Sequence, residues 1–385
     1  DLTLGMQNTG NGLVGVWEYN TDLFDHSTIA RMAGHFVTIL AAIVANPSER
    51  IDQLPMLTAV EQHQLFVEWN DTQADYPQDK CIHQLFEQQV KFTPDAVAVI
   101  FENQQLTYGE LNTQANQLAH YLQDIGVKPE VLVGIYLERS LSIIVTLLAV
   151  LKAGGGYVPL DPDYPQQRLA DISEDSQFSV LITQQKLLNS LPVQGVKVIV
   201  LDTESEMLTN QSPANPVSEV KPENLTCLLY TSGSTGKPKG VMLTHAALVN
   251  HSSAISEVFA LTSADRVLQF ASFSFDVAAE EIFPTWYKGA TVVLRPTQMF
   301  PDFASLSQFI AQESLSVLNI TPAYWHEWAV AVSQDNATVP PSLRLVAVGG
   351  DAVLLETVTI WRQVVGDRVN CLNVYGPTEA SVTAI

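Results

Sequence analysis

From about Ile82 onward, short apolar segments alternate with amphipathic segments of helical period, and this alternation constrains the fold more than any other feature of the chain. Apolar strands that are joined by helices indicate parallel sheets, because two parallel neighbours need a crossover connection between them. The sequence therefore predicts an α/β fold with parallel-rich sheets flanked by helices. The predicted strands are Val131–Leu137, Phe178–Ile182, Val196–Leu201, Leu225–Tyr230, Val267–Phe270, Thr291–Leu294, Val317–Ile320, Leu343–Val348 and Cys371–Tyr375.

Helices are predicted between most of these strands. One begins with capping-box spacing at Thr107 and Glu110, and Gly126 marks its end. Two more are predicted over Ala278–Tyr287 and Leu354–Val365. In open α/β sheets, ligands bind at the loops that leave the carboxyl ends of strands. The candidate loops for a site therefore follow Tyr230, Phe275, Ile320, Val348 and Val374.

The N-terminal region has a different pattern. A strand is predicted around Val14–Tyr19 and a helix over Ile29–Val44, and Asn46-Pro47 ends that helix. The apolar face of the helix needs a partner that the few preceding residues cannot supply. We therefore expect the tail of an upstream domain, with an N-terminal subdomain of the main fold as the alternative. Residues 47–80 are polar and interrupted by prolines, which predicts a docked linker.

Charge and apolar run length limit the partners. The net charge of −22 over 385 residues repels nucleic acid and anionic membranes. The longest uninterrupted apolar runs are shorter than the ~18 residues that a membrane span needs. Three scattered cysteines are typical of a reducing compartment, so we expect a cytoplasmic protein with no nucleic-acid or membrane partner. Any phosphate site must be built locally, and we expect the chain to be a piece of a longer one.

The segment after the strand Leu225–Tyr230 combines glycines, hydroxyl residues and lysines. Glycines allow consecutive backbone N–H groups to converge on an anion, and lysines neutralise phosphate charge. It is not a Walker P-loop, because Pro238 follows Gly236-Lys237. The alternative is an ordinary Gly/Ser turn. The candidate phosphate-binding residues are Thr231, Ser232, Gly233, Ser234, Thr235, Gly236, Lys237, Lys239 and Gly240.

This loop resembles the phosphate-binding signature of AMP-forming adenylating enzymes, and four further segments resemble motifs of that family in the same order. They are Leu106–Asn112, Leu151–Pro162, Phe275–Phe283 and Asn373–Glu379. Gly155 is a mild departure, because the family commonly has Ala there. The resemblance implies the large N-terminal subdomain of the family fold, with the mobile C-terminal subdomain and its catalytic lysine beyond residue 385. The chain alone would then be incomplete for full catalysis.

The resemblance also implies roles for single residues. Tyr375 would pack against adenine, Thr378 would bind the α-phosphate and Glu379 would hold Mg²⁺. Thr235 and Lys239 would join Thr378 and Glu379 in catalysis. The residues around the adenylate would be Gly349, Gly350, Asp351, Asn373, Tyr375, Gly376 and Thr378.

Two features resemble nonribosomal peptide synthetases in particular. Asp276 matches the family position that pairs with a substrate α-ammonium group, although it could equally be a helix N-cap. Residues 1–57 resemble the C-terminal end of a condensation domain, which makes 58–81 the linker and 82–385 a truncated adenylation domain. The alternatives are a ligase similar to acyl-CoA synthetases and a catalytically silent nucleotide-binding module.

The implied reaction joins an amino acid and ATP to give aminoacyl-AMP and pyrophosphate, and then loads a phosphopantetheine thiol on a carrier domain outside the chain. The carrier and condensation domains of the same synthetase would be its partners. Glu280 in an otherwise apolar pocket favours Arg, Lys or ornithine, or Tyr through its hydroxyl, unless Glu280 faces solvent. The substrate-binding candidates are Phe275, Asp276, Val277, Glu280, Asn319, Val346, Val348, Val374, Val382 and Thr383.

Overall fold

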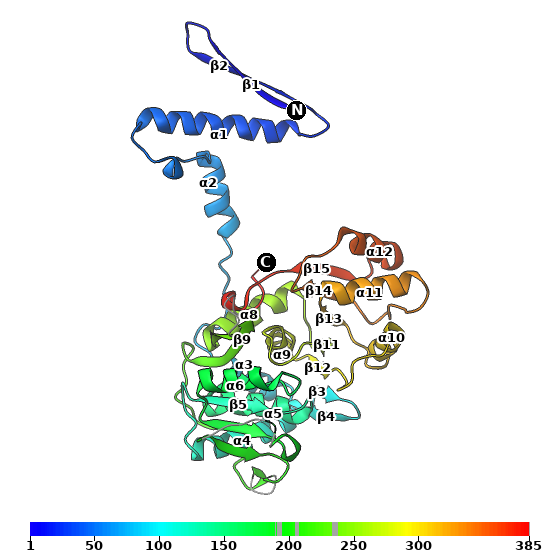
Figure 1. The fold of residues 1–385 in the computed structure, drawn as a ribbon. Coiled ribbons are helices and arrows are strands. Elements are labelled where there is room, and N and C mark those ends of the chain that lie inside the picture. The colour runs from blue at the N-terminus through cyan, green and yellow to red at the C-terminus, as the bar shows by residue number, and fades with distance from the viewer. Residues whose placement is uncertain (189, 191–194, 205–207, 233–237, 385) are drawn as a thin grey trace. The chain divides into compact units, whose positions relative to one another are not determined.

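The structure is a computed structural model that describes residues 1–188, 190, 195–204, 208–232 and 238–384. The chain divides into two compact units, Asp1–Asp75 and a larger unit that begins at Tyr76 (Figure 1). This division falls within the stretch 58–81 in which the sequence predicts a linker.

The first unit contains a β-hairpin and two α-helices. Strands β1 (Leu2–Asn8) and β2 (Leu13–Tyr19) pair antiparallel, and α1 (His26–Ala45) follows them. The predicted strand and helix are confirmed here. The predicted linker holds two short 3₁₀ helices, η1 (Ile51–Gln53) and η2 (Glu68–Asn70), and also α2 (Ala59–Phe66), which the sequence pattern did not indicate.

Helix α2 is fixed to α1 through its own first turn. Thr58 and Glu61 form a capping box, and the Glu61 carboxylate also lies 2.8 Å from Nε2 of His35. Within the described part of the chain, α1 is long and apolar enough to cross a membrane by length and composition. The uninterrupted apolar runs did not indicate this, because polar residues such as His35 are interspersed along the helix.

The second unit is built on two sheets. The six-stranded sheet has the order β10-β9-β6-β5-β7-β8, in which only the outer pair β10–β9 is antiparallel. Its strands are β5 (Leu132–Tyr136), β6 (Gly156–Pro159), β7 (Val180–Thr183), β8 (Lys197–Val200), β9 (Leu225–Ser232) and β10 (Pro238–Thr244).

The seven-stranded sheet has the order β15-β14-β13-β11-β12-β3-β4, with only β4 antiparallel to its neighbour. Its strands are β3 (Val97–Phe101), β4 (Gln104–Thr107), β11 (Arg266–Gln269), β12 (Thr291–Leu294), β13 (Val317–Ile320), β14 (Leu345–Gly349) and β15 (Asn370–Val374). The parallel-rich α/β class predicted from the sequence is confirmed.

Helices connect the strands and cover the sheets. They are α3 (Ile82–Phe92), α4 (Tyr108–Asp124), α5 (Leu141–Ala153), α6 (Gln166–Ser176), α8 (His245–Val258), α9 (Val277–Tyr287), α10 (Phe303–Gln312), α11 (Pro322–Ser333) and α12 (Leu355–Val365), with the 3₁₀ turns η3 (Gln185–Leu187) and η4 (Thr378–Ala380). The predicted capping box is present on α4, where Thr107 Oγ1 accepts from the Glu110 N–H at 3.2 Å.

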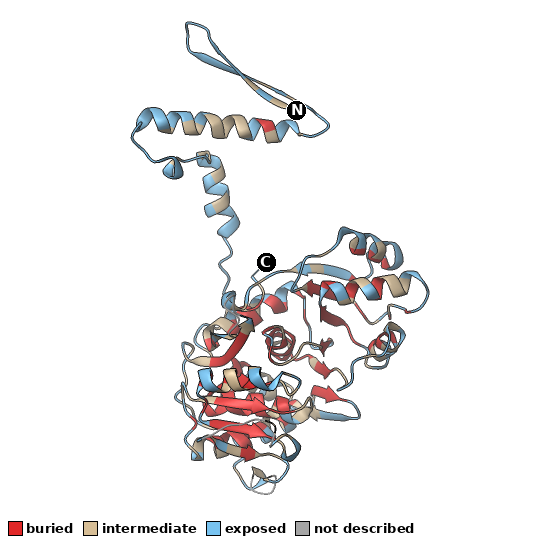
Figure 2. Cartoon of the chain, viewed as in Figure 1, coloured by how far each residue is buried: buried red, intermediate tan, exposed pale blue. Residues whose placement is uncertain are grey.

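Helix α9 occupies the interior of this unit. It is buried from Ala278 to Trp286, and its apolar side chains belong to the large core that also contains residues of β5 and α4 (Figure 2). A helix that is enclosed on all sides cannot leave polar side chains in water. The carboxylates of Glu280 and Glu281 therefore need partners inside the protein.

Candidate functional site

The turn between β11 and α9 is held by the buried carboxylate of Glu281. One oxygen accepts from the backbone N–H groups of Phe270 and Ala271 at 3.1 and 3.2 Å, and the other accepts from the Gln269 amide at 2.8 Å. Burial raises the pKa of Glu281 to about 8, against the opposing effect of these donors. Glu281 thus fixes the backbone that leads to Asp276.

Arg139, which follows β5 in the other sheet, holds the same turn from outside. Its guanidinium donates to the carbonyl oxygens of Gln269 at 3.0 Å and Ala271 at 2.6 Å, and also contacts the Gln269 side chain. The guanidinium lies over the Phe273 ring, 5.0 Å from its centroid. Burial lowers the pKa of Arg139 to about 10. The turn is therefore fixed by both sheets.

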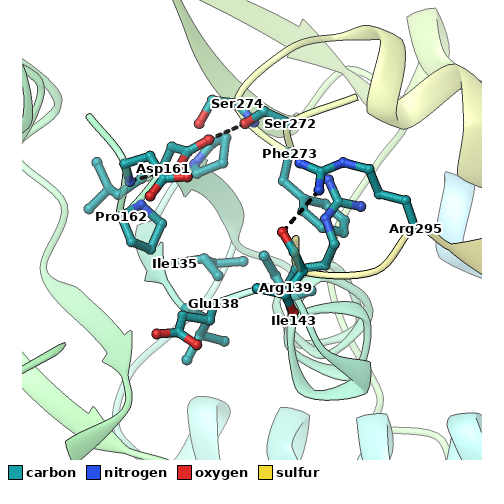
Figure 3. A pocket seen from close by; sticks show the side chains of 15 residues that line it. Ile135, Glu138, Arg139, Ile143, Asp161, Pro162, Ser272, Phe273, Ser274 and Arg295 are labelled. Atoms are coloured by element: carbon teal, nitrogen blue, oxygen red, sulfur yellow. Dashed lines mark hydrogen bonds between the residues drawn. The ribbon is translucent and has the colours of Figure 1, made fainter. Parts of the chain in front are cut away.

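A cavity of about 210 Å³ lies beside this turn (Figure 3). The ends of β5 and β6 form one wall and residues 272–274 form another, and Asp161 hydrogen-bonds Ser272 across it. Arg139 and Arg295 line the cavity, and the sequence analysis singled out neither. Their role depends on contacts between distant segments, which leave no local signal in the sequence.

Asp276 joins the predicted substrate motif to the predicted adenylate motif. Its carboxylate caps α9 by accepting from the Val277 N–H at 2.8 Å, and the Thr378 side chain beside it opposes the effect of burial on its pKa. Burial raises the pKa of Asp276. The N-cap role and a ligand-binding role are compatible, because the capping bond uses one of the two oxygens. Beside Asp276, Val277 is half-buried and Phe275 is exposed.

Glu280 is buried, so the alternative in which it faces solvent is wrong. One carboxylate oxygen accepts from the Asn319 amide at 2.7 Å, and the other lies 2.9 Å from Nε2 of His251. Asn319 comes from β13, as the predicted pocket requires. His251 comes from α8 and was missed, because a lone histidine on an amphipathic helix gives no sequence signal.

Two of the predicted pocket valines lie on the other face of the sheet. Asn319 pairs with Ala347 in the parallel register, and side chains alternate along β14, so Val346 and Val348 point away from Asn319. They pack in the apolar cluster that contains Trp325. The prediction that these two valines line the pocket with Glu280 is therefore wrong in this structure. The apolar run indicated the strand but not which of its faces is turned toward α9.

Val374 lies on the expected face. It pairs with Gly349, two residues after Ala347, and therefore shares the face of Asn319. Asn373 pairs with Val348 and lies on the opposite face. Val382 is buried just after η4, and Thr383 beside it is half-buried.

The predicted adenylate residues lie around η4 and the end of β14. Tyr375 is 67% exposed, which leaves its ring open to a planar ligand. The segment after it folds back, since the Ala384 N–H donates to the Tyr375 carbonyl at 3.0 Å and so encloses Gly376. Thr378 and Glu379 belong to η4, and Glu379 is exposed.

The two glycines at the end of β14, Gly349 and Gly350, are required for different reasons. A Cβ on Gly349 would lie 2.7 Å from Val374, so a side chain is excluded by the neighbouring strand itself. Gly350 has a φ of +90°, a conformation that side chains disfavour, in open space. Asp351 beside them is exposed, and its carboxylate accepts from the Ala352 N–H.

The predicted phosphate loop joins two antiparallel strands. Ser232 at the end of β9 lies opposite Pro238, and Thr231 lies opposite the exposed Lys239, with Gly240 next on β10. Strand β10, which carries Lys239, contacts η4, which carries Thr378. The remaining candidates lie outside the described residues: Gly233, Ser234, Thr235, Gly236 and Lys237.

The described residues contain no group of three or more His, Cys, Asp or Glu side chains that could hold a metal ion by themselves. Mg²⁺ commonly takes one or two carboxylates and completes its shell with phosphate oxygens and water. An exposed Glu379 near the phosphate-loop strands fits that mode, in which the nucleotide supplies the other ligands.

Comparison with known families agrees with this geometry. The family model described as AMP-binding enzyme matches residues 86–385, and the condensation-domain model matches residues 1–66. Chondramide synthase cmdD of Chondromyces crocatus is 42% identical over 100% of this chain. Gramicidin S synthase 2 of Brevibacillus brevis is 39% identical over 99% of it. The chain spans only 10% and 8% of these two relatives.

Solved structures show the same similarity. The nonribosomal peptide synthetase FmoA3 superposes with a TM-score of 0.85 at 26% identity, covering 98% of this chain and 40% of FmoA3. Its form with bound α-methyl-L-serine-AMP also gives 0.85, at 25% identity, covering 99% and 43%. The N-terminal subdomain of Klebsiella oxytoca NpsA gives 0.69 at 25% identity, covering 80% and 76%.

Proposed function

Because the chain belongs to the AMP-binding enzyme family and carries a condensation-domain segment before it, we propose that it activates an amino acid with ATP in a nonribosomal peptide synthetase. The amino-acid carboxylate attacks the α-phosphorus, a new O–P bond forms, and pyrophosphate leaves with the electrons of the broken bond. A carrier thiol then attacks the acyl carbon and AMP leaves. The observation that supports the proposal is that Thr378 of the predicted adenylate motif lies beside Asp276 of the predicted substrate motif.

The chain's own groups position the two substrates and neutralise the charge of the phosphates, and none of them acts as a nucleophile. The ionised Asp276 would pair with the substrate α-ammonium group. Tyr375 would cover adenine, and Thr378 would bind the α-phosphate. Lys239, with Thr235, would hold the phosphates, and Mg²⁺ on Glu379 would neutralise their charge. The adenylate turn Gly349–Asp351, with Asn373 and Gly376, would form the edge of the nucleotide site.

We propose a basic side chain (Arg, Lys or ornithine) or Tyr as the substrate class, on account of Glu280. Each of its oxygens already accepts one hydrogen bond from the protein. A carboxylate has about four lone-pair sites, so it has capacity for a substrate donor as well. The module would act in the cytoplasm, with carrier and condensation domains of the same synthetase as partners and phosphopantetheine on the carrier.

Amino-acid-dependent ATP–pyrophosphate exchange tests the proposal, measured with the module in which this chain is followed by the rest of its adenylation domain. We expect exchange with at least one amino acid of the proposed class and its loss in Asp276→Asn. Exchange driven by fatty acids alone would favour an acyl-CoA synthetase-like ligase. Nucleotide binding without exchange for any acid would favour a silent module. Either result would overturn the proposal.

A further inference from the structure

The polar cluster of Glu280, Asn319 and His251 contains a histidine that the proposed reaction does not use. His251 lies on α8 and is buried together with Glu280, whose side chain is only 1% exposed. Its Nε2 is 2.9 Å from the Glu280 carboxylate. Its Nδ1 is buried and has no hydrogen-bond partner among the described residues. An unpartnered buried polar atom is costly, so a histidine here needs a reason.

Both carboxylate oxygens of Glu280 have an internal partner. Asn319 contacts one oxygen and His251 contacts the other, so the lone pairs that remain can accept a single donor from a ligand. Among the ion pairs of the described residues, His251 is the one cationic-type partner of Glu280. A substrate ammonium or guanidinium group would have to reach a carboxylate that is almost fully enclosed and share it with two internal partners. Such a cation would lose its hydration with little in return.

We infer that His251 is a specificity-determining residue that excludes cationic side chains. It occupies the position at Glu280 that a substrate cation would need, and it leaves the pocket suited to a neutral side chain with one hydrogen-bond donor, such as the Tyr phenol. The inference rests on the proposed function, and it selects Tyr over Arg, Lys and ornithine within the proposed substrate class. His251 acts through Glu280 and touches no reacting atom.

Three variants separate the possible roles. His251→Ala removes the internal donor and opens space, so a substrate cation can meet Glu280. His251→Gln keeps an N–H donor near the place of Nε2, and should keep the wild-type preference. Glu280→Gln removes the charge that attracts a cation, and should disfavour ornithine further. His326 on α11, whose Nδ1 lies 2.7 Å from the Thr357 hydroxyl, provides a matched control as His326→Ala.

The experiment measures kcat/KM for ornithine and for Tyr in pyrophosphate exchange by the intact module, together with the ATP KM. Dissociation constants of the matching aminoacyl-sulfamoyl adenosines give a readout independent of turnover. We expect the wild type to prefer Tyr, and the ornithine-to-Tyr ratio to rise at least tenfold in His251→Ala with an unchanged ATP KM. The ratio should stay within about threefold of wild type in His251→Gln and His326→Ala.

The effect should also depend on Glu280. In the double variant His251→Ala/Glu280→Gln the gain for ornithine should disappear, as a coupled pair requires. A uniform loss for every amino acid in His251→Ala would show a structural role and overturn the inference. So would a wild type that prefers ornithine, Lys or Arg. If His251→Ala does not fold, His251→Ser takes its place: a rise in the ornithine-to-Tyr ratio supports the inference and an unchanged ratio overturns it. Absence of exchange with every amino acid would instead overturn the proposed function.

Discussion

Glu280 and Glu281 are neighbours on α9, yet their carboxylates contact different elements of the fold. Glu280 meets α8 and β13, whereas Glu281 meets the turn after β11. Adjacent residues on an α-helix point about 100° apart, so two neighbouring carboxylates can enter separate polar clusters. The contacts of Glu280 with α8 and β13 can therefore be altered independently of the contacts of Glu281 with the turn after β11.

The turn between β11 and α9 depends on Arg139 for its stability. In Arg139→Lys, we expect the carbonyls of Gln269 and Ala271 to lose partners, because lysine lacks the planar fork that reaches both. Each carbonyl keeps a second donor, the Arg295 N–H for Gln269 and the Gln269 amide for Ala271. A lost hydrogen bond to a charged group costs about 1.5–3 kcal/mol, so the free energy of unfolding should fall by about that amount. Urea unfolding measures it. Arg168→Lys is the control, since Arg168 also lies over an aromatic ring but donates to one carbonyl, that of Tyr230. Equal losses in both variants would contradict a special role for Arg139.

Asp276→Ala should weaken every amino-acid substrate. Removing one member of a buried charged pair costs about 3–5 kcal/mol, which corresponds to roughly a hundredfold loss or more in kcat/KM. The ATP KM should change much less, because the ammonium group is absent from ATP. Asp302→Ala is the control, since Asp302 is also a helix N-cap, on α10, where it accepts from the Ser305 N–H at 2.8 Å. A comparable loss of amino-acid binding in that variant would show that capping alone explains the effect.

The sequence predicted the fold class and several strands that are apolar on both faces, such as β5, because burial on two sides leaves an uninterrupted apolar run. The strands β1, β3, β4, β6 and β10 were missed. Strand β10 begins with Pro238 and carries Lys239 and Gly240, which resemble a loop until the antiparallel pairing with β9 is known. Such a strand can be recognised only from the strand with which it pairs.

The candidate site was predicted in its motifs but not in its internal contacts. Asp276, Asn319 and Glu280 lie together as expected from the resemblance. His251 and Arg139 were missed because their partners are 29 and 130 residues away in sequence. Val346 and Val348 were misplaced because a shift of one residue in strand register reverses the face on which a side chain lies.

Lys239 should matter for ATP rather than for the amino acid. Lys239 is exposed on β10 in a chain of net charge −22, so few other positive groups can compensate for the loss of its charge. We expect Lys239→Ala to raise the ATP KM or lower kcat in pyrophosphate exchange, with the amino-acid KM nearly unchanged. Lys237 lies outside the described residues, and the double variant with Lys237→Ala should show a larger effect. Lys91→Ala, at an exposed site on α3, is the control. An unaltered ATP dependence in the double variant would show that the loop is structural.

The second unit should lose stability in acid because of two buried histidines. Burial lowers the pKa of His245 to about 3, and burial together with the nearby His245 lowers the pKa of His83 well below its usual value. The unfolded chain binds protons at these histidines below about pH 6.5, while the folded chain does not. Their contribution is complete above pH 6.5, and the free energy of unfolding should fall between pH 6.5 and 3. The slope is up to about 1.4 kcal/mol per pH unit for each histidine.

Urea unfolding at a series of pH values measures this slope. His245→Asn should reduce it, because an amide oxygen can still accept from the Ile82 N–H without titrating. His120→Asn, which alters a half-exposed ring on α4 that contacts the Ala214 carbonyl, should leave the slope unchanged. A slope that is identical in His245→Asn and wild type would assign the acid sensitivity to other groups.

Asp276 and the polar residues around Glu280 lie close together along the chain. His251, Asp276, Glu280 and Asn319 all fall between the start of α8 and the end of β13. A single continuous segment, 244–320, could therefore be transplanted between related modules and keep Glu280 together with His251 and Asn319. Shorter grafts limited to α9 would separate Glu280 from both of its donors. The recipient must also have an arginine at the position of Arg139, since this support for the transplanted turn comes from outside the segment.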